Sequence, residues 1–459
     1  MFKSLIGTKD FYKKVLLLTI PIMIQNGITN LVNMLDNIMV GRLGQVEMTG
    51  VAVSNQLIFV FNLCIFGAIS GAGIFGAQFY GNEDHEGVRY TFRFKILFCS
   101  LLTVAGIMVL LFWGDPLISL YLKGEGSAED AAASLNCAKE YIAVMLIGLI
   151  PYTIAQCYSS TLRETGHAFL PMLAGVIAVF VNMMLNAVLI FGLLGAPRLG
   201  VVGAAIATVI SRFVEMFIVI IWTRIKSREN KFIVGAYRSL YVPRALVGKI
   251  FLKGMPLMVN EALWASGMAT LNQRYSVRGL DVVAANNISQ TFFNVFSVAF
   301  LSVGVAIGII LGQMLGSGDN EGARRSSRQL IAFSVFISIA VSAIYAVCAE
   351  FIPLAYNTTN EVQTLATRMM QICAIAMPID AFANATYFTL RSGGKAFITF
   401  LFDSCFVWVI SVPIAFILSE FTSIGILPLY AICLFVNILK CFIGGILVHK
   451  GVWIKNIVN

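Results

Sequence analysis

The sequence predicts an all-α polytopic membrane protein whose twelve transmembrane helices form two six-helix lobes related by an internal repeat. Three observations support this fold class: an apolar composition, the placement of most basic residues on one side of the membrane, and an internal sequence repeat that relates the two halves. Of the 459 residues, 58% are hydrophobic and only 12% are charged. A soluble domain of this length would need a polar exterior, because surface grows more slowly than volume. The composition therefore indicates a chain that lies in a bilayer.

Hydrophobic segments long enough to cross a bilayer recur along the whole chain. The twelve predicted spans are 15–39, 47–76, 93–114, 138–161, 169–193, 199–223, 246–271, 282–311, 329–350, 369–390, 397–419 and 427–447. With this alternation, 23 of the 32 Lys and Arg residues fall on one side and 7 on the other. The positive-inside rule then places both termini and the connection 224–253 in the cytoplasm, which predicts an uncleaved, multi-pass plasma-membrane protein. The net charge of +9 thus reflects topology and indicates no nucleic-acid partner.

The second half of the chain repeats the first at an offset of 235 positions. The clearest match joins GNEDHEGVR (81–89) to GSGDNEGAR (316–324), two links with the composition of tight turns. Farther on, TLRETGHAF (161–169) matches TLRSGGKAF (389–397) at an offset of 228. We expect an N-terminal lobe over 1–223, a cytoplasmic linker over 224–245 and a C-terminal lobe over 246–459. Six spans per lobe is an even number, so the two copies enter the membrane in the same orientation, as in transporters built from parallel repeats.

No pattern in the chain indicates a cofactor, a disulfide framework or an enzyme. The nine cysteines form no CxxC pair and lie mostly in hydrophobic segments, and the three histidines fall in or near polar connections. Neither a GxxxxGK[ST] nor an HExxH motif is present. We therefore expect no resident cofactor, small-molecule and lipid partners only, and a monomer.

The first span combines a proline near one end with a carboxylate near the other. Pro21 removes a backbone hydrogen bond and predicts a hinge in this helix, as Pro256 does at the repeated position. Thr29, Asn33 and Asp36 follow one another at helical spacing and predict a polar face. Because a charge in hydrocarbon costs at least about 2.5 kcal/mol, that face is expected to look into a bundle or a water-filled cavity. A purely structural capping role for Asp36 is the alternative.

The segment DNIMVGRLG (36–44), on this duplicated six-span plan, resembles the multidrug and toxic compound extrusion (MATE) family of secondary transporters. NAVLIFG (186–192) and GVVGAAIAT (200–208) are similar to that family too. The resemblance implies two six-helix lobes around a central cavity that opens alternately to each side. It also implies exchange of H+ or Na+ for small organic, often cationic, drug-like compounds.

The resemblance places a cation-coupling site at Asp36, Asn182, Asn186 and Thr208. Carboxylate, amide and hydroxyl oxygens suit a hard cation such as Na+. Some relatives carry a second acid where this chain has Asn186, so the site has one formal negative charge. Proton coupling through Asp36 is equally compatible, and H+ and Na+ both remain open.

Polar stripes on several spans predict the lining of a substrate cavity. Span ten carries Asp380, Asn384 and Tyr387 on one face, and span seven carries Glu261, which matches the family pattern only in part. The complete set of predicted cavity residues is Glu261, Asp380, Asn384, Tyr387, Asn287, Gln290, Asn33 and Gln56. Hydrogen bonding between helices without a transport role is the alternative for these stripes.

The main alternative function is a lipid-linked oligosaccharide flippase of the same broad superfamily. A flippase of this kind is expected to have more spans and a strongly cationic cavity. The twelve spans and the acidic intramembrane residues, Asp36 among them, favour cation-coupled efflux instead.

Overall fold

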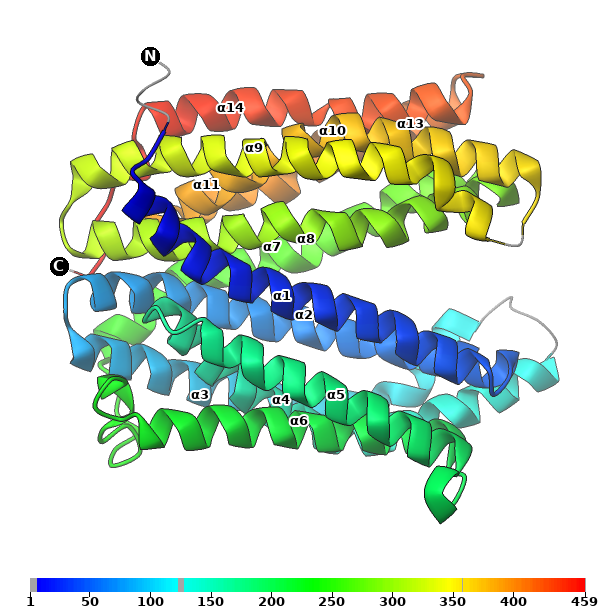
Figure 1. Ribbon diagram of the computed structural model, residues 1–459, viewed down its shortest axis with the longest axis horizontal. Helices are drawn as coiled ribbons and strands as arrows, with labels where there is room; N and C mark the ends of the chain where they lie inside the picture. Colours follow the sequence, from blue (N-terminus) through cyan, green and yellow to red (C-terminus); the bar gives the residue numbers. More distant parts are fainter. Residues whose placement is uncertain (1–5, 123–127, 357, 459) are drawn as a thin grey trace. The chain divides into compact units, whose positions relative to one another are not determined.

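The computed structural model describes residues 6–122, 128–356 and 358–458, without the side chains at 32–34, 37, 38, 122, 128 and 194. The first half is a series of long helices (Figure 1). They are α1 (Lys9–Gly41), α2 (Gln45–Gly81), α3 (His85–Leu122), α4 (Ala128–Glu164), α5 (Phe169–Phe191) and α6 (Gly200–Ile225). Short 3₁₀ turns follow α5 (η2, Leu193–Gly195) and α6 (η3, Lys231–Ile233).

The second half continues with helices of similar length. They are α7 (Arg244–Ser276), α8 (Leu280–Gly316), α9 (Asn320–Phe351) and α10 (Asn360–Ser392), with the 3₁₀ turn η4 (Pro353–Ala355) after α9. The eleventh rod contains two π-helical segments: α11 (Ala396–Phe400), η5 (Leu401–Cys405), η6 (Val407–Ser411) and α12 (Val412–Glu420). The twelfth rod is α13 (Ile426–Phe435) followed by α14 (Asn437–His449).

Ten of these twelve helical rods in the described ranges are long and apolar enough to cross a membrane. The other two are α1, which contains Pro21 and Asp36, and α7, which contains Pro256 and Glu261. The described chain contains helices and no strand. The predicted all-α, twelve-helix fold class is confirmed.

The described helices group into two compact units. One contains residues 24–76 and 85–249, and the other contains 1–23, 77–84 and 250–459. The start of α1 and the end of α2 therefore belong with the second half of the chain, while the connection after α6 belongs with the first.

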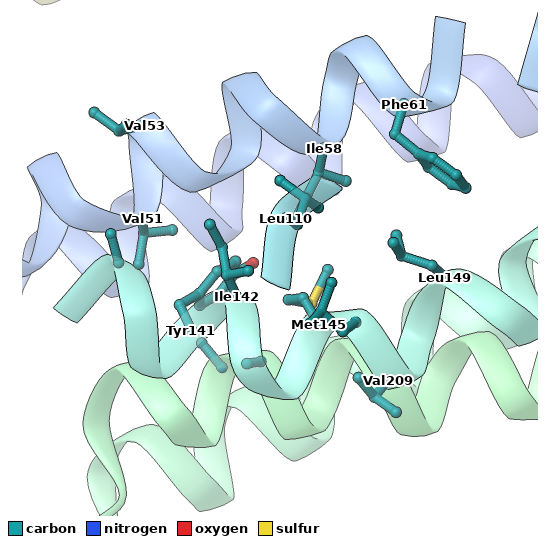
Figure 2. Close-up of a cluster of buried hydrophobic side chains, with 14 of the residues drawn as sticks. Val51, Val53, Ile58, Phe61, Leu110, Tyr141, Ile142, Met145, Leu149 and Val209 are labelled. Atoms are coloured by element: carbon teal, nitrogen blue, oxygen red, sulfur yellow. The ribbon is translucent and has the colours of Figure 1, made fainter. Parts of the chain in front are cut away.

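In the unit of 24–76 and 85–249, the core lies among α2, α3, α4 and α6. Figure 2 shows Ile58 from α2 and Met145 from α4 within one cluster, with Val209 of α6 beside it. These side chains are at most 8% exposed. Close packing of this kind fixes which face of each helix turns inward, and so it fixes where the polar side chains lie.

The other unit has two cores. One contains Met369, Met370 and Tyr345 from α10 and α9, and the second contains Val303 and Leu390 from α8 and α10. Each of these five side chains is fully buried.

The two repeated links have the same backbone geometry. Glu83 and Gly318, which are 235 positions apart, both have a left-handed φ, of 58° and 81°. Three backbone hydrogen bonds recur at the same offset, among them Asp84 N to Phe79 O (2.9 Å) and Asp319 N to Met314 O (3.1 Å). In the second copy, the Asp319 carboxylate accepts from the Gly322 amide at 2.8 Å and so forms an N-cap of α9. The prediction of tight turns at these two links is confirmed.

The ends of α2 and α8 cross at repeated glycines. A Cβ on Gly81 would fall on the backbone carbonyl of Gln313, and a Cβ on Gly316 would fall on that of Gln78. All four residues belong to the same unit. Only glycine permits this approach of two backbones. The two contacts involve equivalent positions of the internal repeat, since Gly81 matches Gly316 and Gln78 matches Gln313.

The connection after α6 is fastened to α3 by one arginine. The Arg93 guanidinium donates to the carbonyl oxygens of Gly235 (2.8 Å), Ala236 (2.7 Å) and Tyr241 (3.1 Å). The Tyr237 hydroxyl adds a 2.6 Å hydrogen bond with Tyr158 of α4. This connection is therefore an ordered part of the unit of 24–76 and 85–249.

Candidate functional site

Three of the predicted coupling residues meet at the Asp36 carboxylate on α1. Asn186 of α5 donates from Nδ2 to Asp36 Oδ1 at 2.6 Å. Asn182, one turn earlier on α5, lies 3.2 Å from both carboxylate oxygens. Both asparagines are at least 95% buried, so these contacts are shielded from solvent. Hydrogen bonds to an ionised carboxylate are among the strong ones in proteins.

Thr208 of α6 completes this group through Asn182. When the Asn182 amide nitrogen faces Asp36, its oxygen accepts from Thr208 Oγ1 at 3.2 Å and from the Thr208 backbone amide at 3.3 Å. That orientation is chemically consistent, because the carboxylate then faces donors only. The Asn186 side-chain oxygen has no hydrogen-bond partner among the described groups. An unpartnered buried oxygen next to a carboxylate is free to accept a proton donor or a cation.

Two further residues of the same unit influence Asp36. Tyr141 of α4 hydrogen bonds with Thr208 and also donates to Asn55 Oδ1 at 3.3 Å. Arg212, one turn after Thr208 on α6, interacts electrostatically with Asp36. The Arg212 guanidinium also pairs with Glu215 at 3.3 Å and lies 4.9 Å from the ring centroid of Tyr152. Arg212 and Glu215 are three positions apart on α6, so both side chains lie on the same face of that helix.

The cluster brings together a carboxylate, two amides and a hydroxyl from three helices, α1, α5 and α6. Arg212 interacts electrostatically with its one carboxylate, Asp36. No three His, Cys, Asp or Glu side chains converge on a metal-sized site in the part of the chain that the structure describes.

The second predicted group lies in the unit that contains α7 and α10. Glu261 of α7 hydrogen bonds with the Tyr387 hydroxyl and interacts electrostatically with Arg391 and Asp403. Asp380, two turns before Tyr387 on α10, accepts from Asn437 Nδ2 of α14 at 3.1 Å. The two acids therefore face different neighbours.

A third acidic group in this unit is the ion pair of Asp403 with Lys440. The ammonium of Lys440 on α14 hydrogen bonds with Asp403 Oδ1 of η5. Asn260 of α7, which is 1% exposed, donates to the other carboxylate oxygen at 3.2 Å. This pair links the eleventh and twelfth rods of the described chain.

The remaining predicted residues lie in several environments. Asn384 is half-buried, and its Oδ1 lies against Gly304 of α8. Gln290 donates to the Tyr430 hydroxyl at 3.5 Å, whereas Asn287 is exposed. Gln56 is exposed on α2, and its neighbour Asn55 accepts the hydrogen bond from Tyr141. The side chain of Asn33 lies outside the described residues, and Pro21 and Pro256 each lie inside an unbroken helix.

Sequence inspection missed Tyr141, Asn260 and Asn437. Asn260 is adjacent to Glu261 in a mid-span NE pair, which is a signal that inspection could have used. Tyr141 stands near the start of the predicted span 138–161, where polar residues are ordinary, whereas Asn437 stands in the middle of the predicted span 427–447. Only the packing of α4 on α6 and of α14 on α10 brings these two residues to the sites.

Comparison with known proteins identifies the family of this chain. The MatE family model matches residues 21–188 and 256–417, and the two matches begin at the same offset of 235 as the repeat. A probable multidrug resistance protein NorM of Thermotoga maritima is 26% identical over 427 residues, covering 91% of this chain and 88% of that protein. A probable multidrug resistance protein YoeA of Bacillus subtilis is 23% identical over 421 residues, covering 91% and 89%.

Solved structures show the same fold. The Vibrio cholerae MATE transporter VcmN superposes with a TM-score of 0.85 at 17% identity, over 99% of both chains. An outward-facing multidrug resistance MATE family transporter of the MOP superfamily superposes with a TM-score of 0.84 at 21% identity, over 98% of both chains.

The fold, the repeat and the intramembrane acids thus define a multi-pass membrane protein with the two-lobe architecture of secondary transporters. The chain belongs to the MATE family, as its resemblance to that family predicted. The relatives are named multidrug resistance proteins, which does not favour the oligosaccharide flippase.

Proposed function

We propose that this protein is a secondary active transporter that exports small organic, often cationic, compounds in exchange for H+ or Na+. It is a transporter rather than an enzyme, works as a monomer in the bacterial inner membrane, and has both termini in the cytoplasm. Its lobes are 1–223 and 246–459, joined by the linker 224–245, and they expose the cavity alternately to each side. Small molecules and lipid are its partners, and nucleic acid is not.

The observation that carries this proposal is the carboxylate of Asp36 held by two buried amides. Asn186 and Asn182 come from one face of α5, and Thr208 supports Asn182 from α6. An intramembrane carboxylate is costly and is a functional group by default. Its charge is satisfied by polar contacts that can be exchanged for a proton or a cation, which is what a coupling site requires.

The identity of the coupling ion depends on Asn186. Its Nδ2 donates to Asp36, while its Oδ1 is unpartnered. A proton binds to the carboxylate without any rotation of this amide. Na+ needs several oxygen ligands, so its binding turns Oδ1 of Asn186 toward the ion. The two ions are therefore distinguished by whether transport depends on an oxygen at position 186.

The acids of the second lobe are proposed to select the substrate. Glu261 and Asp380 each accept a hydrogen bond, from Tyr387 and Asn437, and each is in electrostatic contact with a basic side chain of its own lobe. A carboxylate in this setting attracts a cationic solute more than a neutral one. Glu261→Gln and Asp380→Asn are therefore expected to weaken transport of cations more than of neutral compounds, whereas equal loss for both would indicate a structural role.

The test of the coupling role is dye efflux from proteoliposomes under an imposed H+ or Na+ gradient. Asp36→Asn is expected to abolish gradient-driven efflux. The matched control is Asp10→Asn, which changes an exposed carboxylate in the first turn of the same helix. Normal coupling in Asp36→Asn would remove this carboxylate from the mechanism.

A further inference from the structure

Lys440 is a buried ammonium group that the proposed transport cycle does not use. It lies on α14 and is 9% exposed. Its Nζ hydrogen bonds with Asp403 and lies 5.3 Å from the ring centroid of Phe402 and 5.9 Å from that of Phe406. Phe402 and Asp403 belong to the π-helical segment η5, Phe406 lies between η5 and η6, and both phenylalanines are 5% exposed. A carboxylate flanked by aromatic faces is the environment in which proteins recognise organic ammonium ions.

The carboxylate is held in place independently of the lysine. Asn260 donates to Asp403 Oδ2 at 3.2 Å. Asn260 is itself anchored by Ser404, whose hydroxyl lies 2.7 Å from both oxygens of Asn260. Ser404 is fully buried, and its backbone amide also donates to Asn260 Oδ1 at 3.3 Å. The site therefore keeps its geometry when the ammonium leaves, which is the condition for binding another cation there.

A second carboxylate is within electrostatic reach of the same ammonium. Asp380 on α10 interacts with Lys440, and Asn437, one turn before Lys440 on α14, donates to Asp380 at 3.1 Å. Lysine carries its charge on a flexible four-carbon stem, so it can move between two acceptors without a change of backbone. Glu261 on α7 also interacts electrostatically with Asp403, and it interacts with Arg391 of α10 as well.

We propose that Asp403, Phe402 and Phe406 form a binding subsite for an organic monocation, and that Lys440 is its tethered occupant. An incoming cation displaces the ammonium toward Asp380 and takes its place between the carboxylate and the rings. This proposal rests on the proposed export of organic cations and adds the residues that bind them. Lys440 competes with the substrate for the Asp403 carboxylate, so only cations with enough affinity for the subsite to displace the ammonium bind there.

The test is equilibrium binding of tetraphenylphosphonium and of an uncharged dye of similar size to the purified full-length protein in detergent, without an ion gradient. Lys440→Met removes the competitor and retains an unbranched apolar chain. Apparent affinity falls in proportion to the fraction of protein with a free site, so the variant is expected to bind the cation about threefold to tenfold more tightly. Lys440→Arg keeps a tethered cation and is expected to bind like the unmodified protein.

Two controls separate this effect from general electrostatics and from misfolding. Lys450→Met removes an equal charge at an exposed position just beyond α14 and is expected to change nothing. The double variant Lys440→Met with Asp403→Asn contains no unpaired buried carboxylate, and it is expected to lose the gain while remaining folded. The subsite is overturned if Lys440→Met binds the cation no more tightly than Lys450→Met, if the uncharged dye gains equally, or if the double variant keeps the gain.

This readout is independent of transport. If the protein exports no compound but Lys440→Met still binds the cation more tightly, the proposed function fails and the subsite stands. If export is normal and Lys440→Met shows no gain in affinity, the subsite alone fails.

Discussion

The buried ion pair between Lys95 and Glu164 allows a quantitative test of how the first unit is held together. Lys95 on α3 donates to both carboxylate oxygens of Glu164 on α4, at 2.6 and 2.7 Å, and to Ser160 and Thr161 at 3.2 and 3.1 Å. The side chains are 0% and 6% exposed. Glu164 also fills the space beside Gly73 of α2, where a Cβ would lie 2.7 Å from Oε1. The pair therefore ties three helices together.

Replacing only the lysine is expected to be costly. Lys95→Met leaves a buried carboxylate without its counter-charge, which costs about 3–5 kcal/mol of unfolding free energy. Lys95→Met combined with Glu164→Leu removes both charges. The double variant is expected to lose only about 1 kcal/mol of unfolding free energy, because the Ser160 hydroxyl loses the 2.5 Å hydrogen bond that it donates to Glu164. The two substitutions are thus expected to couple strongly rather than add.

The assay is equilibrium unfolding of the purified protein in detergent, followed by circular dichroism. The matched control is Lys226→Met in the pair of Lys226 with Glu229, which is 3.1 Å long but about half exposed on both sides. An exposed pair is worth about 0–1 kcal/mol, so this variant should unfold almost as the original does. The reasoning is refuted if Lys95→Met unfolds like Lys226→Met, or if the double variant loses the sum of the two single losses.

Three further predictions concern the linker, the helix crossing and the coupling ion. Arg93→Ala removes three hydrogen bonds to linker carbonyls and should speed chymotrypsin cleavage in the linker severalfold. Arg238→Ala, at an exposed linker position, should not change the cleavage rate. Equal cleavage rates in the two variants would show that Arg93 does not hold the linker. Gly316→Ala places a Cβ on a backbone carbonyl and should lower the unfolding free energy by about 1–3 kcal/mol. In the control variant Gly114→Ala, the added Cβ meets open space, so the unfolding free energy should not fall. Unchanged stability of Gly316→Ala would contradict the close crossing of α2 and α8. Asn186→Asp adds a second carboxylate beside Asp36 and should strengthen the dependence of efflux on Na+; unchanged ion dependence would place the coupling ion elsewhere.

The fold could be predicted from the sequence because its signals are local or periodic. The glycines at 81 and 316 stand in matching turns, so the same residues that reveal the repeat also form the turns. The grouping of Asp36 with Asn186 was expected from the resemblance to a family, and not from spacing alone. The structure adds the distances that make this grouping a candidate site.

The contacts that could not be predicted from the sequence depend on tertiary packing, which produces no periodic pattern in the sequence. Lys440 and Asp403 are 37 positions apart on different rods, and only the packing of α14 against η5 brings their charges together. Arg93 shows the same limit. Its position at a span boundary is typical of an ordinary positive-inside residue. However, Arg93 holds the linker through three backbone carbonyls, and backbone groups cannot be recognised from the sequence.

The central claim is that ion flow down a gradient drives solute export through Asp36. The most direct measurement is efflux of a cationic dye from proteoliposomes, with an H+ gradient and a Na+ gradient imposed separately, in parallel with Asp36→Asn. We expect the dye to move against its concentration under at least one gradient, and this movement to stop in the variant. Failure to move the dye under either gradient, or equal movement by Asp36→Asn, would contradict the claim.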